Sequence, residues 1–143
     1  MIPEFGEIVE AVVEYPRLSM IKRRSDGRID FVSPIPCPYN YGSIPGLVAG
    51  DGDPLDAVIL GARLPVGARV RRPVVAVVDF IDDGAADPKV VLGAEPLSAG
   101  ERRGLWLFFA IYSRFKRALA RLRGSRRETR VRGLRAPPRA PRG

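Results

Sequence analysis

The chain has 143 residues, of which 45% are apolar, so it is long enough for one cored domain and too short for two of ordinary size. It contains no histidine, which excludes Ser-His-Asp and Cys-His catalysis and proton transfer by imidazole. The net charge of +8 is unevenly divided: residues 1–113 carry 12 basic and 15 acidic side chains, whereas residues 114–143 carry 12 basic and one acidic side chain. The basicity therefore belongs to the C-terminal part.

The distribution of apolar residues and cysteine narrows the class further. The longest apolar runs, such as residues 74–78, are far shorter than the roughly 20 residues that cross a bilayer. The first residues lack a basic and then apolar leader, so we expect a cytoplasmic protein that makes no membrane contact. Cys37 is the only cysteine, which excludes an internal disulfide and favours a buried structural thiol.

Short candidate strands separated by glycine and proline occupy the first two thirds of the chain. Residues 7–15 are rich in β-branched side chains and stop before Pro16. The other candidate strands are residues 27–32, 55–60, 68–71, 73–80 and 89–92. Alternating prolines at 34, 36 and 38 indicate a shaped loop or sheet edge. Five or six short strands predict a mainly β fold, a small closed or partly closed barrel.

One amphipathic helix follows the strands. Between Glu101 and Arg123, apolar residues recur at spacings of three and four, from Leu105 to Leu122, so this helix should pack on the barrel. Beyond Gly124 the chain consists mostly of Arg, Pro, Gly and Ala, which cannot bury enough surface to offset the entropy of ordering. We therefore expect one domain over residues 1–123 and a disordered basic tail over residues 124–143.

Residues 51–56, Asp-Gly-Asp-Pro-Leu-Asp, bring three carboxylates together. Asp51 and Asp53 lie on one side of an extended backbone, and the bend at Gly52 and Pro54 lets Asp56 rejoin them. Two carboxylates about 4 Å apart repel by about 4 kcal/mol at an effective dielectric of 20, so three favour a bound cation.

Ligands that are all oxygen favour Mg²⁺, Mn²⁺ or Ca²⁺. An EF-hand is excluded, because its sixth and twelfth positions would be Asp56 and Ala62 where Gly and Glu are required. From these six residues alone, a solvated acidic turn remains the alternative.

A second acidic segment, residues 81–89, contains Asp82 and Asp87 and ends in Lys89. By itself it is typical of an acidic hairpin loop. Together with the first cluster it indicates a site for a polyanion, because such a substrate needs metal ions and ammonium groups aimed at one place.

The order and spacing of five elements resemble the soluble, magnesium-dependent family I inorganic pyrophosphatases from about Glu7 to Lys116. These elements are Glu14-Tyr15-Pro16 with Lys22, the segment Cys37-Pro38-Tyr39-Asn40-Tyr41-Gly42, the signature at 51–56, the second acidic loop with Asp82, Asp87 and Lys89, and the run Phe108-Phe109-Ala110-Ile111-Tyr112. Two of the three lysines, Lys22 and Lys89, fall where this family needs an ammonium.

The resemblance implies a fold, an activity and a set of roles. The fold is an α+β, mainly β, five-stranded OB-like barrel with a C-terminal helix, often assembled as a hexamer or dimer. The activity is hydrolysis of pyrophosphate to two phosphates with two or more Mg²⁺ ions. The implied metal ligands are Asp51, Asp53, Asp56, Asp82, Asp87 and Glu14. Asp53 would also accept the proton of the attacking water. The implied substrate-binding residues are Lys22, Tyr41, Lys89 and Tyr112.

The chain departs from the family pattern in its phosphate-binding residues. Arg23 and Arg24 stand where an aromatic residue and a glutamate are usual, and the arginine expected between Gly27 and Tyr41 has no clear counterpart. The lysine that normally follows the helix tyrosine is Ser113, so Arg114 or Lys116 would have to replace it.

Two alternative functions stay open for this reason. One is a non-catalytic or altered-substrate binder of phosphate or nucleotide that depends on Mg²⁺. The other is a nucleic-acid-binding barrel that uses its basic tail, although residues 1–113 carry a net charge of −3.

Overall fold

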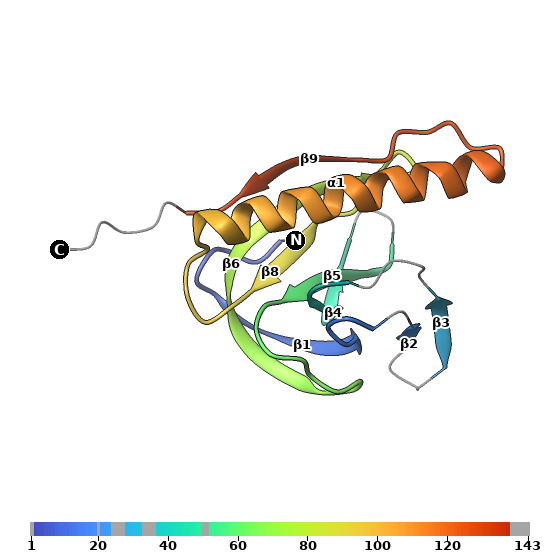
Figure 1. Ribbon diagram of the computed structural model, residues 1–143. Helices are drawn as coiled ribbons and strands as arrows, with labels where there is room; N and C mark the ends of the chain where they lie inside the picture. Colours follow the sequence, from blue (N-terminus) through green and yellow to red (C-terminus); the bar gives the residue numbers. More distant parts are fainter. Residues whose placement is uncertain (1, 20, 24–27, 33–36, 50–51, 138–143) are drawn as a thin grey trace.

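A closed five-stranded barrel forms the body of the molecule. The computed structural model describes residues 2–19, 21–23, 28–32, 37–49 and 52–137. The barrel strands, in spatial order, are β1 (Ile8–Tyr15), β4 (Asn40–Val48), β5 (Pro54–Ile59), β8 (Lys89–Leu92) and β6 (Arg69–Asp82). Pairing of β6 with β1 closes the ring, and every barrel pairing except β5 with β8 is antiparallel. This arrangement confirms the predicted five-stranded barrel with a C-terminal helix (Figure 1).

Two apolar clusters lie on the two faces of the barrel wall. One draws residues from all five barrel strands and none from the helix, so it fills the barrel interior; Val13, Leu55 and Leu92 are members. The other includes Leu105 and Phe109 of the helix and packs them against the outer face of the wall. Because side chains alternate along a strand, the same strands serve both clusters. Cys37 belongs to the outer cluster, where burial raises the pKa of its thiol to about 11.

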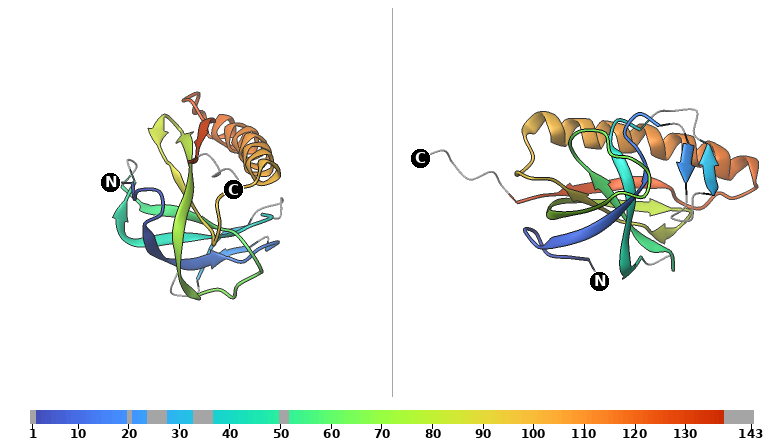
Figure 2. Two further views of the ribbon diagram at one scale, coloured as in Figure 1. Left: turned by 90° about the vertical axis from the view of Figure 1, so that its left-hand side faces the viewer. Right: turned by 90° about the horizontal axis from the view of Figure 1, so that it is seen from below.

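Helix α1 (Ala99–Leu122) lies across the barrel, as both views in Figure 2 show. Ser98 begins it with a capping box, in which its hydroxyl accepts from the Glu101 N–H while the Glu101 carboxylate accepts from the Ser98 N–H. The predicted apolar stripe is correct at Leu105 and wrong at Leu122, which is 85% exposed because it lies at the far end of the helix. In the described part of the chain, no helix is long and apolar enough to span a membrane.

Strand β4 is a strand that the sequence analysis did not predict; it follows the proline-rich segment, of which Pro34 and Pro36 lie outside the described residues. Its glycines and Pro45 have low β propensity, which hides the strand from local patterns. Gly42 is required for packing, because a Cβ atom there would lie 1.9 Å from the carbonyl oxygen of Val12 in β1. The closure of β1 on β4 therefore depends on a residue that weakens the strand signal.

Gly42→Ala should lower the free energy of unfolding by about 1–3 kcal/mol, because the added methyl group must push β1 and β4 apart. Gly100→Ala is the matched control, since its Cβ would meet nothing closer than Ser98 Oγ at 3.9 Å. Alanine in that helical turn should stabilise the protein by about 0.5–1 kcal/mol. Urea denaturation measures both changes, and equal midpoints for the two variants would contradict the prediction.

Strand β6 joins two segments that the sequence predicted as separate strands at 68–71 and 73–80. Pro73 does not interrupt it, because β6 changes partner at this point from β1 to β8. Two further elements stand outside the barrel: a hairpin of β2 (Ile21–Arg23) and β3 (Ile29–Val32), and the short strand β7 (Ala85–Ala86) beside the end of β6.

The expectation of disorder throughout residues 124–143 is wrong for the segment that forms β9 (Arg130–Arg135). This strand pairs antiparallel with β6 from Val77 to Ile81 and runs beside α1 (Figure 1). Val131 and Leu134 pack against the outer cluster. Backbone pairing and these two apolar contacts order a segment whose composition suggested a solvated tail.

Candidate active site

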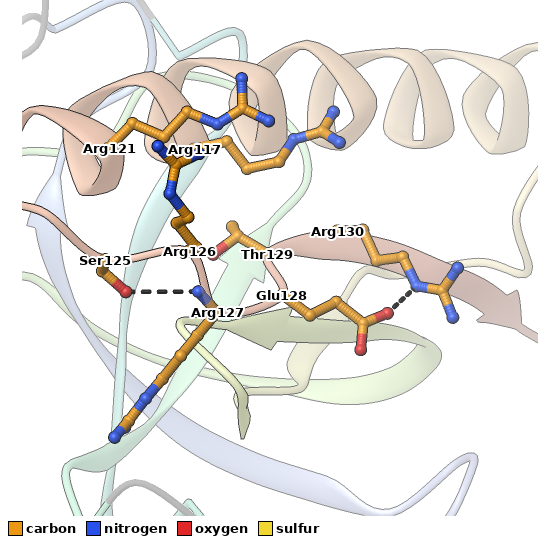
Figure 3. Close-up of a pocket in the computed structure, with 8 residues that line it drawn as sticks. All are labelled: Arg117, Arg121, Ser125, Arg126, Arg127, Glu128, Thr129 and Arg130. Atoms are coloured by element: carbon orange, nitrogen blue, oxygen red, sulfur yellow. Dashed lines mark hydrogen bonds and ion pairs between the residues drawn. The ribbon is translucent and has the colours of Figure 1, made fainter.

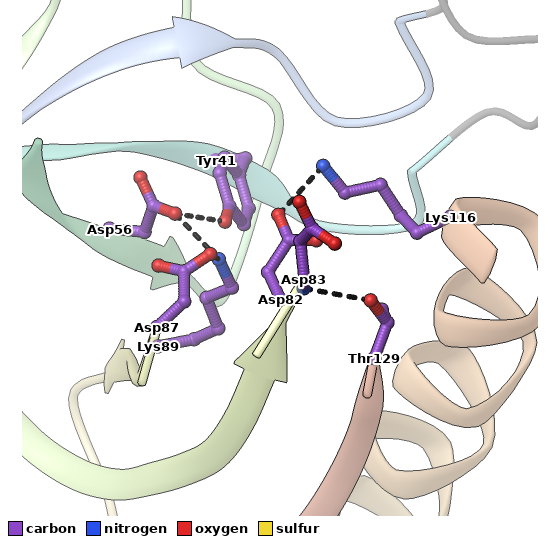
Figure 4. Close-up of polar contacts among 8 residues, drawn as sticks. All are labelled: Tyr41, Asp56, Asp82, Asp83, Asp87, Lys89, Lys116 and Thr129. Carbon is purple, nitrogen blue, oxygen red and sulfur yellow. Dashed lines mark hydrogen bonds and ion pairs between the residues drawn. The ribbon is translucent and has the colours of Figure 1, made fainter. Parts of the chain in front are cut away.

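The parallel pairing of β5 with β8 creates the centre of the site. Its register places Asp56 beside Lys89 on the outer face of the wall, the same face on which the helix packs. Lys89 Nζ donates to Asp56 Oδ2 and to Asp87 Oδ2, each at 2.6 Å, and Tyr41 Oη donates to Asp56 Oδ2 at 2.8 Å (Figure 4). The fold brings these four residues together from three strands and a loop.

Burial makes the charges of this group strongly interdependent. Lys89 is 2% exposed, and its Nζ lies 5.3 Å from the centre of the Phe80 ring. Burial alone would lower the pKa of Lys89, but the carboxylates of Asp56 and Asp87 outweigh it and raise the pKa above its ordinary value. Burial and the charge of Asp56 also raise the pKa of Tyr41 well above its ordinary value. Both shifts favour a charged Lys89 and a protonated Tyr41 hydroxyl near neutral pH.

A two-residue turn presents the second acidic segment. Asp83 and Gly84 have φ values of 50° and 83°, and Asp-Gly is the favoured sequence when both turn residues are left-handed. The turn leaves Asp82 at the end of β6, while the Asp87 N–H donates to the Phe80 carbonyl at 2.9 Å and turns Asp87 toward Lys89. The predicted grouping of Asp82, Asp87 and Lys89 thus depends on one tight hairpin.

Helix α1 contributes Tyr112 and Lys116 on one face. Lys116 Nζ lies 2.9 Å from Asp82 Oδ2 (Figure 4). The same atom lies 5.8 Å from the centre of the Tyr112 ring. Burial alone would lower the pKa of Lys116, but Tyr112 and the hydrogen bond with Asp82 raise it. Ser113 points elsewhere, since it is buried and donates to the Ala110 carbonyl of its own helix at 2.7 Å.

The remaining expected site residues lie around this centre or outside the described residues. Asp53 is exposed in the turn that leads into β5. Glu14 is half-buried at the bulge between Val13 and Tyr15 of β1, next to the point where Tyr15 pairs with Tyr41. Lys22 lies in β2 opposite Phe31. Asp51 lies outside the described residues.

The donor set can be tested for its fit to a divalent cation. Asp56 and Asp87 already direct carboxylate oxygens onto one positive charge, the ammonium of Lys89, and all neighbouring candidate ligands are carboxylates. Oxygen ligands of this kind fit a hard cation. Among the described residues, no three His, Cys, Asp or Glu side chains are grouped closely enough to hold an ion. The ligand types of these residues therefore fit a divalent cation. Asp51, a further carboxylate of the 51–56 signature, lies outside the described residues.

Comparison with known proteins agrees with this geometry. Residues 11–96 match the family model described as inorganic pyrophosphatase. The inorganic pyrophosphatase of Aeropyrum pernix is 35% identical over 97 residues, which cover 62% of this chain and 54% of the relative. The soluble inorganic pyrophosphatase of Oryza sativa subsp. indica is 34% identical over 97 residues and is covered to 45%. The chain thus spans about half the length of the curated relatives it matches.

Solved structures extend the similarity over nearly the whole chain. An inorganic pyrophosphatase from Neisseria gonorrhoeae superposes with a TM-score of 0.72 at 26% identity, covering 92% of this chain and 83% of that one. The enzyme from Thermus thermophilus gives a TM-score of 0.72 at 27% identity, covering 94% and 87%. The fold and the carboxylate site define a barrel of the pyrophosphatase type. The chain belongs to the inorganic pyrophosphatase family.

Lys116 is a candidate site residue that the sequence analysis did not assign. It was only one of two candidates to replace the lysine missing at Ser113. The sequence contains a pattern that could have identified this residue. Lys116 is one of only three lysines, and it follows Tyr112 by four residues, which places both side chains on one helix face.

Proposed function

We propose that this chain hydrolyses inorganic pyrophosphate to two phosphates and uses Mg²⁺ to do so. The observation that carries the proposal is the group of Asp56, Asp87 and Lys89, in which carboxylates for cations and an ammonium for phosphate oxygens share one buried position. The family relationship supports the same activity. Phosphoryl transfer to water needs mainly positioning and charge neutralisation, which charged side chains of this kind provide.

The residues of this chain divide into two groups in the proposed mechanism. Lys22, Lys89, Tyr41 and Tyr112 would donate hydrogen bonds to phosphate oxygens, and Lys116 would join them from the helix. Asp53, exposed at the edge of the site, would accept a proton from the attacking water at its carboxylate. The positive charge of Lys89 and the neutral hydroxyl of Tyr41 support their assignment as donors.

The carboxylates would hold the divalent cations. Asp51, Asp56 and Asp87 would hold the first ion, and Asp82, Asp53 and Glu14 would serve further ions directly or through water. The chemistry that such ions supply when bound is neutralisation of phosphate charge and activation of water near neutral pH. Asp56 and Asp87 would hold the ion in place of their present contacts with Lys89, and the Lys89 ammonium would then donate to a phosphate oxygen.

Phosphate release from pyrophosphate tests the proposal directly. The protein should release phosphate with excess Mg²⁺ and none with a chelator. Fluoride or Ca²⁺ should inhibit the release. A protein that binds pyrophosphate with Mg²⁺ but does not release phosphate would instead support the altered-substrate binder, for which the replacement of the clamp lysine by Ser113 is the motivation.

Lys116→Met should lower kcat/KM by about 10- to 100-fold, because it removes one charge-assisted hydrogen bond to a phosphate oxygen. The free energy of unfolding should change by about 1 kcal/mol or less, since the pair with Asp82 is partly exposed. Lys116→Arg, which keeps the charge, should retain more activity than Lys116→Met. Steady-state kinetics distinguishes these outcomes. Full activity in Lys116→Met would remove this residue from the site.

A further inference from the structure

A second charged site lies at the C-terminal end of α1, outside the segment that matches the family. It is a cavity of about 180 Å³ between the last turns of the helix, the connecting loop and the start of β9 (Figure 3). Its lining residues are Arg117, Arg121, Ser125, Arg126, Arg127, Glu128, Thr129 and Arg130. Five arginines and one glutamate give this lining a strongly positive charge.

The positive charge of the cavity is not neutralised within the described residues. Glu128 pairs with Arg130, whereas Arg117, Arg121, Arg126 and Arg127 have no described carboxylate within ion-pair distance. One or two basic residues would offset the negative end of a helix dipole, which amounts to about half an elementary charge. Four arginines without a described carboxylate partner exceed what the helix dipole can offset. The positive charges that line one cavity also repel one another.

The positions of the guanidinium groups favour one ligand between them. Figure 3 draws the side chains of Arg117, Arg121 and Arg126 in one region beside the end of the helix, while that of Arg127 extends away from them. The stem of Arg127 packs over Gly84, within 3.4 Å of where a Cβ atom would lie. Arg117, Arg121 and Arg126 are therefore the groups placed to bind one ligand together.

The loop that carries Arg126 and Arg127, between α1 and β9, is fixed to the β6–β7 hairpin. The Asp83 N–H donates to Thr129 Oγ1 at 2.8 Å, the Gly84 N–H donates to the Glu128 carbonyl at 2.7 Å, and Ser125 donates to the Asp83 carboxylate. Thr129 is 1% exposed. Because the loop is held before any ligand arrives, binding would cost little ordering entropy.

We propose that this cavity, which we call the arginine pocket, binds a small phosphate-bearing oxyanion of the size of inorganic phosphate or pyrophosphate. Guanidinium groups match phosphate oxygens with paired hydrogen bonds, and Arg117, Arg121 and Arg126 all line this cavity. The cavity, of about 180 Å³, is smaller than the roughly 300–1,000 Å³ of sites that enclose drug-sized ligands, so its size favours a small anion over a nucleoside. In Figure 4, Asp82 and Asp83 lie between Lys89 and Thr129, which lines the pocket.

Binding to the arginine pocket can be measured apart from the candidate active site. In a buffer with a chelator, the carboxylates around Lys89 have no divalent ion with which to attract an anion, so this binding does not depend on the proposed hydrolysis. We expect isothermal titration of the intact chain with pyrophosphate, and separately with inorganic phosphate, to show binding that weakens as salt is added. The double variant Arg121→Gln/Arg126→Gln should bind at least about 10-fold more weakly.

Arg103→Gln is the matched control, because Arg103 is exposed on the same helix and does not line the pocket. It should bind as the wild type does. Circular dichroism should show equal helix content in all three proteins. Absence of binding to the wild type, or equal binding to the double variant, would overturn the proposal. So would loss of binding to a single-stranded oligonucleotide in the double variant when neither small anion binds, since the pocket would then serve nucleic acid.

Discussion

Lys89→Met is expected to lower the free energy of unfolding by about 3–5 kcal/mol, because it leaves two carboxylates buried against each other without their shared cation. Asp56 and Asp87 both direct Oδ2 onto Lys89 Nζ at 2.6 Å, and that lysine is 2% exposed. Urea denaturation in the presence of a chelator measures the effect. Lys116→Met is the matched control, since its ion pair is partly exposed and should contribute about 1 kcal/mol or less.

Two further measurements sharpen the test of Lys89. Its pKa is raised in the folded protein, so its contribution should be complete at any pH below the ordinary value of 10.5 and should fall only as the pH rises beyond it. The loss in Lys89→Met should therefore be the same at pH 7 and pH 9. Added Mg²⁺ should stabilise the variant more than the wild type, because the ion can take the place of the ammonium. If Lys89→Met were as stable as Lys116→Met, the buried ion pairs of Lys89 with Asp56 and Asp87 would be contradicted.

Asp53→Asn is expected to lower kcat by about 10²- to 10⁴-fold, because the amide keeps the size of the side chain but cannot accept a proton. Asp53 is exposed, so the free energy of unfolding should change by about 0.5 kcal/mol or less. Phosphate release at saturating pyrophosphate and Mg²⁺ measures the loss.

Asp79→Asn provides the control for a carboxylate lost elsewhere. Asp79 lies in β6 and pairs with Arg135 of β9, outside the candidate active site. This variant should keep its activity. If Asp53→Asn were as active as Asp79→Asn, the proton would have to go to another group.

The sequence predicted those parts of the fold and site that depend on local patterns. Richness in β-branched residues identified β1, punctuation by glycine and proline identified β5 and β8, and spacing of three and four identified α1. The pairing of β5 with β8 then brought together Asp56 and Lys89, which the family pattern had already singled out. The role of the site residues themselves stays a prediction until the variants are measured.

The features that the sequence did not predict depend on contacts between distant segments. β4 contains Gly42 because β1 passes too close for a side chain, and that need is invisible in local propensity. Lys116 became a site residue only when the helix was placed beside Asp82. The arginine pocket likewise depends on a long-range contact. The β6–β7 hairpin holds in place a loop whose amino-acid composition predicts disorder.

Strand β9 has a consequence for solubility. It covers the edge of β6 from Val77 to Ile81, a stretch of mostly apolar residues whose backbone groups would otherwise be open to another chain. Exposed edges of this kind promote aggregation, and charged residues beside them oppose it. The arginines at 130, 132 and 135 are exposed along β9, so its own edge is guarded by charge. Truncation of the chain at Gly124 would remove β9 and expose the apolar edge of β6. The truncated protein should therefore aggregate under conditions in which the intact chain stays in solution.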